Sequence, residues 1–320
     1  MRNYLDNLYL TLGMVELSMS SKLYKKLVMK AIKIVRRMFY NSRLKNLKFV
    51  TTIYEKLFHS IFSKSELINL NSFGAQLQIP GKDITLLPSL LNNTFEKELL
   101  SFLVSYLTVG MVFVDVGANV GIHSSIAARC VGASGKIFAF EPVPENYDIL
   151  ILNLSQNIYG TSENVFCAEQ VAISDQVGNA TIYLAENSIG THSMSESKSG
   201  TERSIQIQTT TLDRYFESSN FKIDVLKIDI EGHELPALAG AVKTLSQTDL
   251  IFIEFDTNHF DHESKIEKLL ELTRGHPFLY FFDEGRGKVK KINSQEVYGL
   301  KLCNNLMFSK FEINDSLLGS

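Results

Sequence analysis

Short apolar runs alternate with amphipathic stretches along most of the chain from residue 111 onward. The apolar runs predict strands, and the stretches between them repeat apolar residues at the three- and four-residue spacing of helices. The predicted strands lie at 111–116, 136–141, 165–173, 224–230, 250–255, 278–283 and 304–309. The predicted helices lie near 121–131, 145–157, 234–245 and 262–274. This alternation predicts an α/β fold with a mostly parallel sheet covered by helices on both faces.

Two further regions carry weaker patterns. Residues 67–87 alternate apolar and polar positions around Gly74, which predicts a short hairpin, and a helix is expected from Thr94 as its N-cap to Leu107. Between the third and fourth predicted strands, 181–186 and 204–212 add two β-type segments. The polar loop between them, 187–203, is long for a connection and predicts a substrate-facing lid.

Charge divides the chain into a basic first segment and an acidic remainder. The net charge is −3, but residues 1–64 hold 13 Lys and Arg against three acidic residues, a net of +10 that leaves −13 for 65–320. Apolar residues recur at helical spacing within 23–38, with basic residues between them. We expect a basic helical extension over 1–66 and one domain over 67–320. The extension could be a packed helix with a solvated basic face, or a helix that binds anionic membrane or nucleic acid.

Cysteines and targeting signals favour a cytoplasmic protein. Cys130, Cys167 and Cys303 are far apart, without the spacing of a zinc site or a disulfide framework, which predicts a reducing compartment. The sequence has no signal peptide pattern and no uncharged run near the ~20 residues of a membrane-spanning helix. We therefore expect a cytoplasmic location, with peripheral membrane contact through residues 1–64 left open.

The most informative motif is FVDVGANVG at 113–121. An apolar run ends in Asp115, small residues follow, and the next apolar run ends in Glu141. A strand, a glycine turn, a helix and a second strand ending in a carboxylate form half of a nucleotide pocket, because backbone approaches the ligand closely and the acid accepts from ribose. The third glycine of a dinucleotide loop is missing, which disfavours a dehydrogenase.

A second motif, DVLKIDIEGHE at 224–234, gathers acid–base side chains at the end of a predicted central strand. They are Asp229, Glu231, His233 and Glu234. Open α/β sheets bind ligands at the carboxyl ends of their strands, so these groups are candidates for contact with a substrate. Glu231 and Glu234 could instead only cap the helix that follows.

The two motifs, together with Glu141-Pro142 and TTTLDRYF at 209–216, resemble the FkbM family of methyltransferases. The resemblance covers roughly residues 94–310. It implies a class I methyltransferase with a Rossmann-like, seven-stranded, mostly parallel sheet, and S-adenosylmethionine (SAM) as the methyl donor.

The resemblance also implies roles for particular residues. The methionine end of the cofactor would lie against the loop residues Asp115, Gly117, Asn119 and Gly121. Glu141 would accept both ribose hydroxyls, and the segment that begins at Ala172 would flank the adenine. Gly190 and Ser193 would lie over the substrate.

Members of the family are associated with methylation of sugar and polyketide hydroxyls, so the resemblance implies O-methylation of a sugar, glycan or natural-product acceptor. A hydroxyl acceptor needs a base or a metal nearby. Asp229 is the first candidate for contact with the acceptor or the sulfonium, with Glu231 and His233 as alternative bases. A magnesium-type site from Asp229, Glu254 and Asp256 is a further alternative, but a metal is not expected.

Two other functions stay open at this stage. The basic first segment could serve an RNA methyltransferase by tracking phosphates, although the acidic remainder would repel RNA and no RNA-binding motif occurs. The chain could also be a non-catalytic cofactor-binding protein, which the intact Asp229 and Glu231 disfavour.

Overall fold

A computed structural model describes residues 58–59, 62, 67–84, 86–158, 166–184, 192, 194, 203–301 and 304–318. The chain divides into two units, Met1–Glu66 and Leu67–Ser320. The predicted basic helical extension lies outside the described residues, apart from 58, 59 and 62. Most of the predicted lid at 187–203 lies outside them as well.

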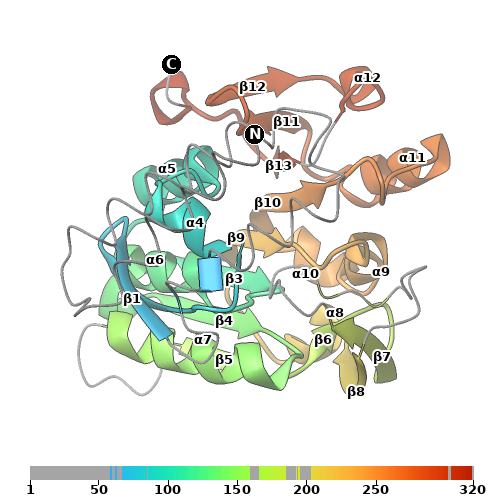
Figure 1. The fold of residues 1–320 in the computed structure, drawn as a ribbon. Coiled ribbons are helices and arrows are strands. Elements are labelled where there is room, and N and C mark those ends of the chain that lie inside the picture. The colour runs from blue at the N-terminus through green and yellow to red at the C-terminus, as the bar shows by residue number, and fades with distance from the viewer. Residues whose placement is uncertain are drawn as a thin grey trace, which may run out of the picture. The chain divides into compact units, whose positions relative to one another are not determined.

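The second unit is built on one large sheet (Figure 1). Among the described residues its eight strands follow the order β12-β11-β13-β10-β9-β3-β4-β5. Their bounds are β3 (Val112–Val116), β4 (Lys136–Phe140), β5 (Phe166–Glu169), β9 (Ile223–Ile228), β10 (Thr248–Phe255), β11 (Phe278–Asp283), β12 (Lys288–Ile292) and β13 (Asn304–Ser309). The neighbouring strands β10, β9, β3, β4 and β5 run parallel to one another, and β13 is antiparallel to both β10 and β11. The predicted α/β class is confirmed; the sheet, predicted to be mostly parallel, is mixed, with β13, β11 and β12 joined to it by antiparallel pairing.

The predicted count of seven strands is corrected to eight. The extra strand, β12, pairs antiparallel with β11 at the edge of the sheet. Its sequence, KVKKI, has three lysines and no fully buried residue. A charged edge strand resists pairing with other chains, but the same charges remove the apolar signal by which strands are recognised.

Helices cover both faces of the sheet (Figure 1). On one face Phe113, Val225 and Phe252 pack against α5 (Lys97–Tyr106), α6 (Ile122–Val131) and α7 (Pro144–Asn157). On the other face Leu226 and Ile251 pack against α8 (Leu212–Tyr215), α9 (Glu234–Ala239), α10 (Val242–Ser246) and α11 (Glu263–Leu272). Neighbouring residues of a strand point to opposite faces, so near-continuous apolar strands fill two cores at once.

The predicted hairpin is present as β1 (Leu67–Ser72) and β2 (Ala75–Pro80), and α4 (Leu86–Leu91) follows it. Its turn residues Phe73 and Gly74 are both left-handed, with φ of 47° and 82°. On α7, the Asn153 and Asn157 side chains accept hydrogen bonds from the backbone N–H groups of β2 and donate to its carbonyls. These bonds satisfy the free edge of the hairpin and fix it against the helix.

The predicted strand at 165–173 is wrong in its extent. β5 ends at Glu169, and β6 (Ala172–Ile173) belongs to a separate three-stranded sheet with β7 (Gly178–Leu184) and β8 (Arg203–Thr210). β7 and β8 correspond to the predicted segments at 181–186 and 204–212. One continuous β-type pattern therefore crosses from one sheet to another, which apolar periodicity alone cannot indicate.

Two helix predictions also need correction. The helix expected from Thr94 begins at Lys97, and its N-cap is Glu96, a left-handed residue with φ 35°. The helix expected over 234–245 is divided into α9 and α10 next to Gly240, where a Cβ would lie 2.1 Å from the backbone oxygen of Ser174. In the part of the chain that the structure describes, no helix combines the length and apolar character needed to cross a bilayer.

Candidate functional site

The loop between β3 and α6 makes a tight turn at the carboxyl end of the sheet. Gly117, Asn119 and Gly121 are all left-handed, with φ of 79°, 52° and 80°. The backbone N–H groups of Gly117 and Ala118 both donate to the carbonyl of Phe140, at 3.0 Å each. The loop is therefore fixed to the end of β4, beside the acid that follows that strand.

Replacing Gly117 with alanine is expected to displace this loop. The new Cβ would lie 1.9 Å from the backbone oxygen of Asp229, and the position has a positive φ that L-residues adopt at a cost. We expect a loss of about 2 kcal/mol or more in unfolding free energy, measured by urea denaturation. Gly275→Ala is the matched control, because nothing lies within 4 Å of a Cβ there; equal effects of the two substitutions would contradict this account of the loop.

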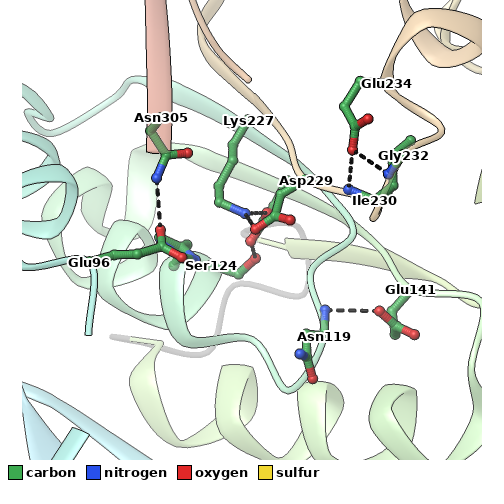
Figure 2. A network of polar contacts seen from close by, with 12 residues as sticks. Glu96, Asn119, Ser124, Glu141, Lys227, Asp229, Ile230, Gly232, Glu234 and Asn305 are labelled. Atoms are coloured by element: carbon green, nitrogen blue, oxygen red, sulfur yellow. Dashed lines mark hydrogen bonds and ion pairs between the residues drawn. The ribbon is translucent and has the colours of Figure 1, made fainter. Parts of the chain in front are cut away.

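Glu141 lies buried beside the loop, directly after β4. Its carboxylate accepts a hydrogen bond from the backbone N–H of Asn119 at 2.9 Å (Figure 2) and another from that of Val143, also at 2.9 Å. Only 5% of the residue is exposed, and burial raises its pKa to about 7 even though the two backbone donors lower it. A buried carboxylate with lone pairs still available is suited to accept hydrogen bonds from ligand hydroxyls.

A buried ion-pair cluster occupies the centre of the site. The Lys227 Nζ lies 2.8 Å from Asp229 Oδ2 and 3.9 Å from Asp115 Oδ1. Ser124 Oγ donates to Asp115 Oδ2 at 2.6 Å. Burial lowers the pKa of Lys227, but Asp229, Asp115 and Glu96 together raise it above its usual value. The structure therefore joins Asp115 and Asp229, from two different motifs, through Lys227, which was not among the predicted site residues.

A second polar group lies next to this cluster. Glu96 Oε2 accepts from His123 Nε2 at 3.0 Å and from the Asn305 amide at 3.5 Å. The three residues come from the segment before α5, from the first turn of α6 and from β13. None of the three was predicted from the sequence, where only His123 carried a signal, since it follows the glycine loop by two residues.

The remaining predicted acid–base residues, Glu231, His233 and Glu234, lie between β9 and the first turn of α9, and each has different neighbours. Glu231 is left-handed with φ 52°, and burial raises its pKa to about 8, with further contributions from the neighbouring Asp229, Glu234 and Asp256 carboxylates. Glu234 accepts from the backbone N–H groups of Ile230 and Gly232, both at 3.1 Å. Both donors precede α9, which has no side-chain cap hydrogen bond, so the capping alternative is wrong for Glu234.

His233 has a different set of neighbours from Asp229. Its Nε2 lies 2.9 Å from Ser174 Oγ, and burial lowers its pKa. Ser174 follows β6, whose first residue is the buried Ala172 predicted near the adenine. The imidazole therefore faces the β6 side of the site, and no hydrogen bond joins it to Asp229 among the described residues.

Two further predictions concern the residues expected over the substrate and the alternative metal site. Gly190 and Ser193 lie outside the described residues. Over the residues that the structure does describe, no group of three or more His, Cys, Asp or Glu side chains is arranged to hold a metal ion, and this includes Asp229, Glu254 and Asp256.

The residues present fit a cofactor that carries adenosine and amino-acid groups. Two buried oxygens next to the loop, Asp115 Oδ1 and Asn119 Oδ1, have no hydrogen-bond partner. Buried acceptors without donors are costly, so a ligand that supplies N–H or O–H groups there would stabilise the site. Glu141, with its raised pKa, would gain in the same way from ribose hydroxyls.

A mixed α/β sheet with a glycine turn and a carboxylate at adjacent strand ends is the arrangement by which proteins of the Rossmann-like class hold nucleotide cofactors. The family model for the methyltransferase FkbM domain matches residues 115–281, slightly more than half of the chain. The chain belongs to this methyltransferase family, and the predicted membership is confirmed.

Individual relatives match over shorter stretches. The hexuronic acid methyltransferase AglP of Haloferax volcanii is 33% identical over 144 residues, which cover 44% of this chain and 54% of AglP. The match thus spans about half the length of that relative. The crystal structure of methyltransferase FkbM from Methylobacillus flagellatus KT aligns with a TM-score of 0.40 at 16% identity, over 62% of this chain and 43% of that one. A SAM-dependent methyltransferase from Agrobacterium tumefaciens aligns with a TM-score of 0.44 at 10% identity, over 77% and 71%.

Proposed function

We propose that the protein is a SAM-dependent O-methyltransferase whose acceptor is a hydroxyl of a sugar, glycan or natural product. The observation that carries the proposal is Glu141, a buried carboxylate with a raised pKa that is held by the backbone of the glycine loop. Membership of the FkbM family supports methyl transfer, and the hexuronic acid named for AglP supports a sugar-type acceptor.

The proposed roles of the cofactor-side residues follow from their positions. Bound SAM supplies an activated methyl group on a sulfonium. Glu141 accepts the ribose hydroxyls, the loop from Gly117 to Gly121 allows the backbone to approach the ligand, and Asp115 faces its methionine end. Holding donor and acceptor in line accounts for much of the acceleration in such a displacement.

The acceptor side is assigned to the turn after β9. A general base works best when its pKa lies near the operating pH, and Glu231, with a pKa of about 8, meets this condition. Asp229, at the end of β9 and paired with Lys227, is assigned contact with the acceptor or the sulfonium. His233 is the less suitable base because its imidazole already contacts Ser174.

The pKa of Glu141 predicts a pH dependence for ribose binding. The ionised carboxylate accepts more hydrogen bonds than the protonated form, and with a pKa of about 7 the ionised fraction rises about tenfold between pH 6 and pH 8. We expect the affinity for 5′-methylthioadenosine, which has no titrating amino group, to rise by up to about tenfold over this range. Calorimetry at both pH values measures it, and Glu141→Gln should bind weakly at both; a wild-type affinity that is equal at the two would contradict the assignment.

The proposed activity is tested by incubating the full chain with methyl-labelled SAM and separate pools of oligosaccharides, lipid-linked sugars and RNA. Label in a sugar fraction is the expected result. Label in RNA alone would overturn the acceptor class, and no binding of SAM would overturn the proposal as a whole.

A further inference from the structure

Glu96 has a left-handed backbone conformation that capping of the following helix does not explain. It is the N-cap residue of α5, with φ 35° and ψ 47°, and its side chain makes no cap hydrogen bond. The first N–H groups of that helix instead donate to Glu284, at 3.1 Å from Glu98 and 3.0 Å from Leu99. A non-glycine residue in this conformation is strained, and such strain often marks a functional position. Its effect here is to direct the carboxylate toward His123 and Asn305.

The cluster around Lys227 holds more negative than positive charge. Three carboxylates, from Glu96, Asp115 and Asp229, act on the single ammonium of Lys227. Burial raises the pKa of Glu96, but His123, Lys227 and Asn305 lower it below its usual value, so this carboxylate is ionised at neutral pH. Surplus negative charge in a buried site is costly unless a cation compensates it.

Two acceptor atoms in this group lack donors. Asp115 Oδ1 and Asn305 Oδ1 have no hydrogen-bond partner, and the two residues are only 0% and 5% exposed. The orientation of the Asn305 amide follows from its contact with Glu96, because a carboxylate can only accept and so faces the amide nitrogen. Glu96 itself keeps 22% of its side chain exposed, and a ligand can therefore reach it.

The acceptor residues Glu96, Asp115 and Asn305 lie at the same edge of the sheet as the proposed ribose site. Figure 2 shows Glu96 and Asn305 on one side of the Lys227 cluster, and Glu141 and Asn119 on the other. Glu141 follows β4, Asp115 lies in the next strand, β3, and Asp229 directly follows β9, the strand after that; neighbouring strands lie about 4.8 Å apart. A cofactor held by its ribose at Glu141 and extended along this edge brings its amino-acid end to Asp115 and Glu96.

We propose that Glu96, Asp115 and Asn305 form the binding site for the α-ammonium group of SAM, with His123 orienting the Glu96 carboxylate. An ammonium supplies the missing positive charge and three N–H donors for the acceptors that lack them. The proposal rests on the proposed function, and it adds a recognition role for Glu96, His123 and Asn305, which lie outside the two sequence motifs.

The test measures cofactor binding by calorimetry at pH 7 with the full chain. The ligands are SAM, S-adenosylhomocysteine, which keeps the amine but carries no sulfonium charge, and 5′-methylthioadenosine, which lacks both. We expect Glu96→Gln and Asn305→Leu each to weaken SAM and S-adenosylhomocysteine about tenfold, and to leave 5′-methylthioadenosine unchanged. Glu267→Gln, on the exposed face of α11, removes a carboxylate away from the site and should change none of the three.

The outcomes separate this inference from the proposed function. If wild-type protein binds SAM and both variants bind it equally well, or lose all three ligands in parallel, the ammonium site is wrong and the methyltransferase proposal stands. If wild-type protein binds no SAM, both fail. Thermal unfolding of each variant shows whether it is folded, and Asn305→Leu carries the test if Glu96→Gln is not.

Discussion

Asp229→Asn is expected to abolish methyl transfer while the protein still binds SAM. Asp229 lies at the carboxyl end of the central strand β9, and 24% of its side chain is exposed there. Asparagine has nearly the same shape but carries no charge, so it cannot stabilise the positive charge that moves from the sulfonium toward the acceptor oxygen. Loss of one electrostatic contact of this kind lowers kcat by about 10²- to 10³-fold. Single-turnover assays with labelled SAM, alongside calorimetric affinity, measure both properties.

Asp249→Asn is the matched control for this variant. Asp249 also pairs with a lysine, Lys222 at 2.6 Å, but it lies at the start of strand β10, outside the site. Its turnover should equal that of the wild type. Normal turnover in Asp229→Asn would contradict the contact with the acceptor or the sulfonium assigned to Asp229.

Lys227→Met is expected to cause the largest loss of stability. The lysine is 2% exposed and forms ion pairs with Asp229 and Asp115, so its removal leaves buried carboxylates without a counter-charge. Breaking a buried pair in this way costs about 3–5 kcal/mol. For a unit of this size we expect the thermal midpoint to fall by roughly 10 °C, measured without ligand by circular dichroism.

The same substitution at Lys222 provides the comparison. Lys222 also bridges two aspartates, Asp224 at 3.2 Å and Asp249 at 2.6 Å, but its side chain is 57% exposed. Exposed pairs contribute about 0–1 kcal/mol, so Lys222→Met should lower the midpoint by a few degrees at most. A Lys227→Met midpoint no lower than that of Lys222→Met would contradict the role given to burial.

The sequence predicted the parts of the site that lie within single motifs. The loop with Asp115 and Gly117 is local, since a strand, a glycine turn and a helix follow one another within a few residues. Glu141 ends the next strand, and parallel neighbours end at the same edge of a sheet. For the same reason, the second motif correctly brought Asp229 to this edge.

Contacts between distant segments could not be predicted in this way. Glu96 and Asn305 are separated by 209 positions, and their contact depends on β13 running antiparallel beside β10. The position of His233 depends on Ser174, which directly follows β6, and β6 belongs to a second sheet rather than to the predicted third strand. Hydrophobic periodicity identifies elements, but it carries no information on which polar side chains meet across them.

Calorimetric titration of the full chain tests most directly whether the site beside the FVDVGANVG loop binds SAM. We predict saturable binding of SAM at a single site with a micromolar dissociation constant, weakened by Asp115→Ala and by Glu141→Ala, and no heat of binding with NAD. Binding of NAD with no heat from SAM would contradict the account.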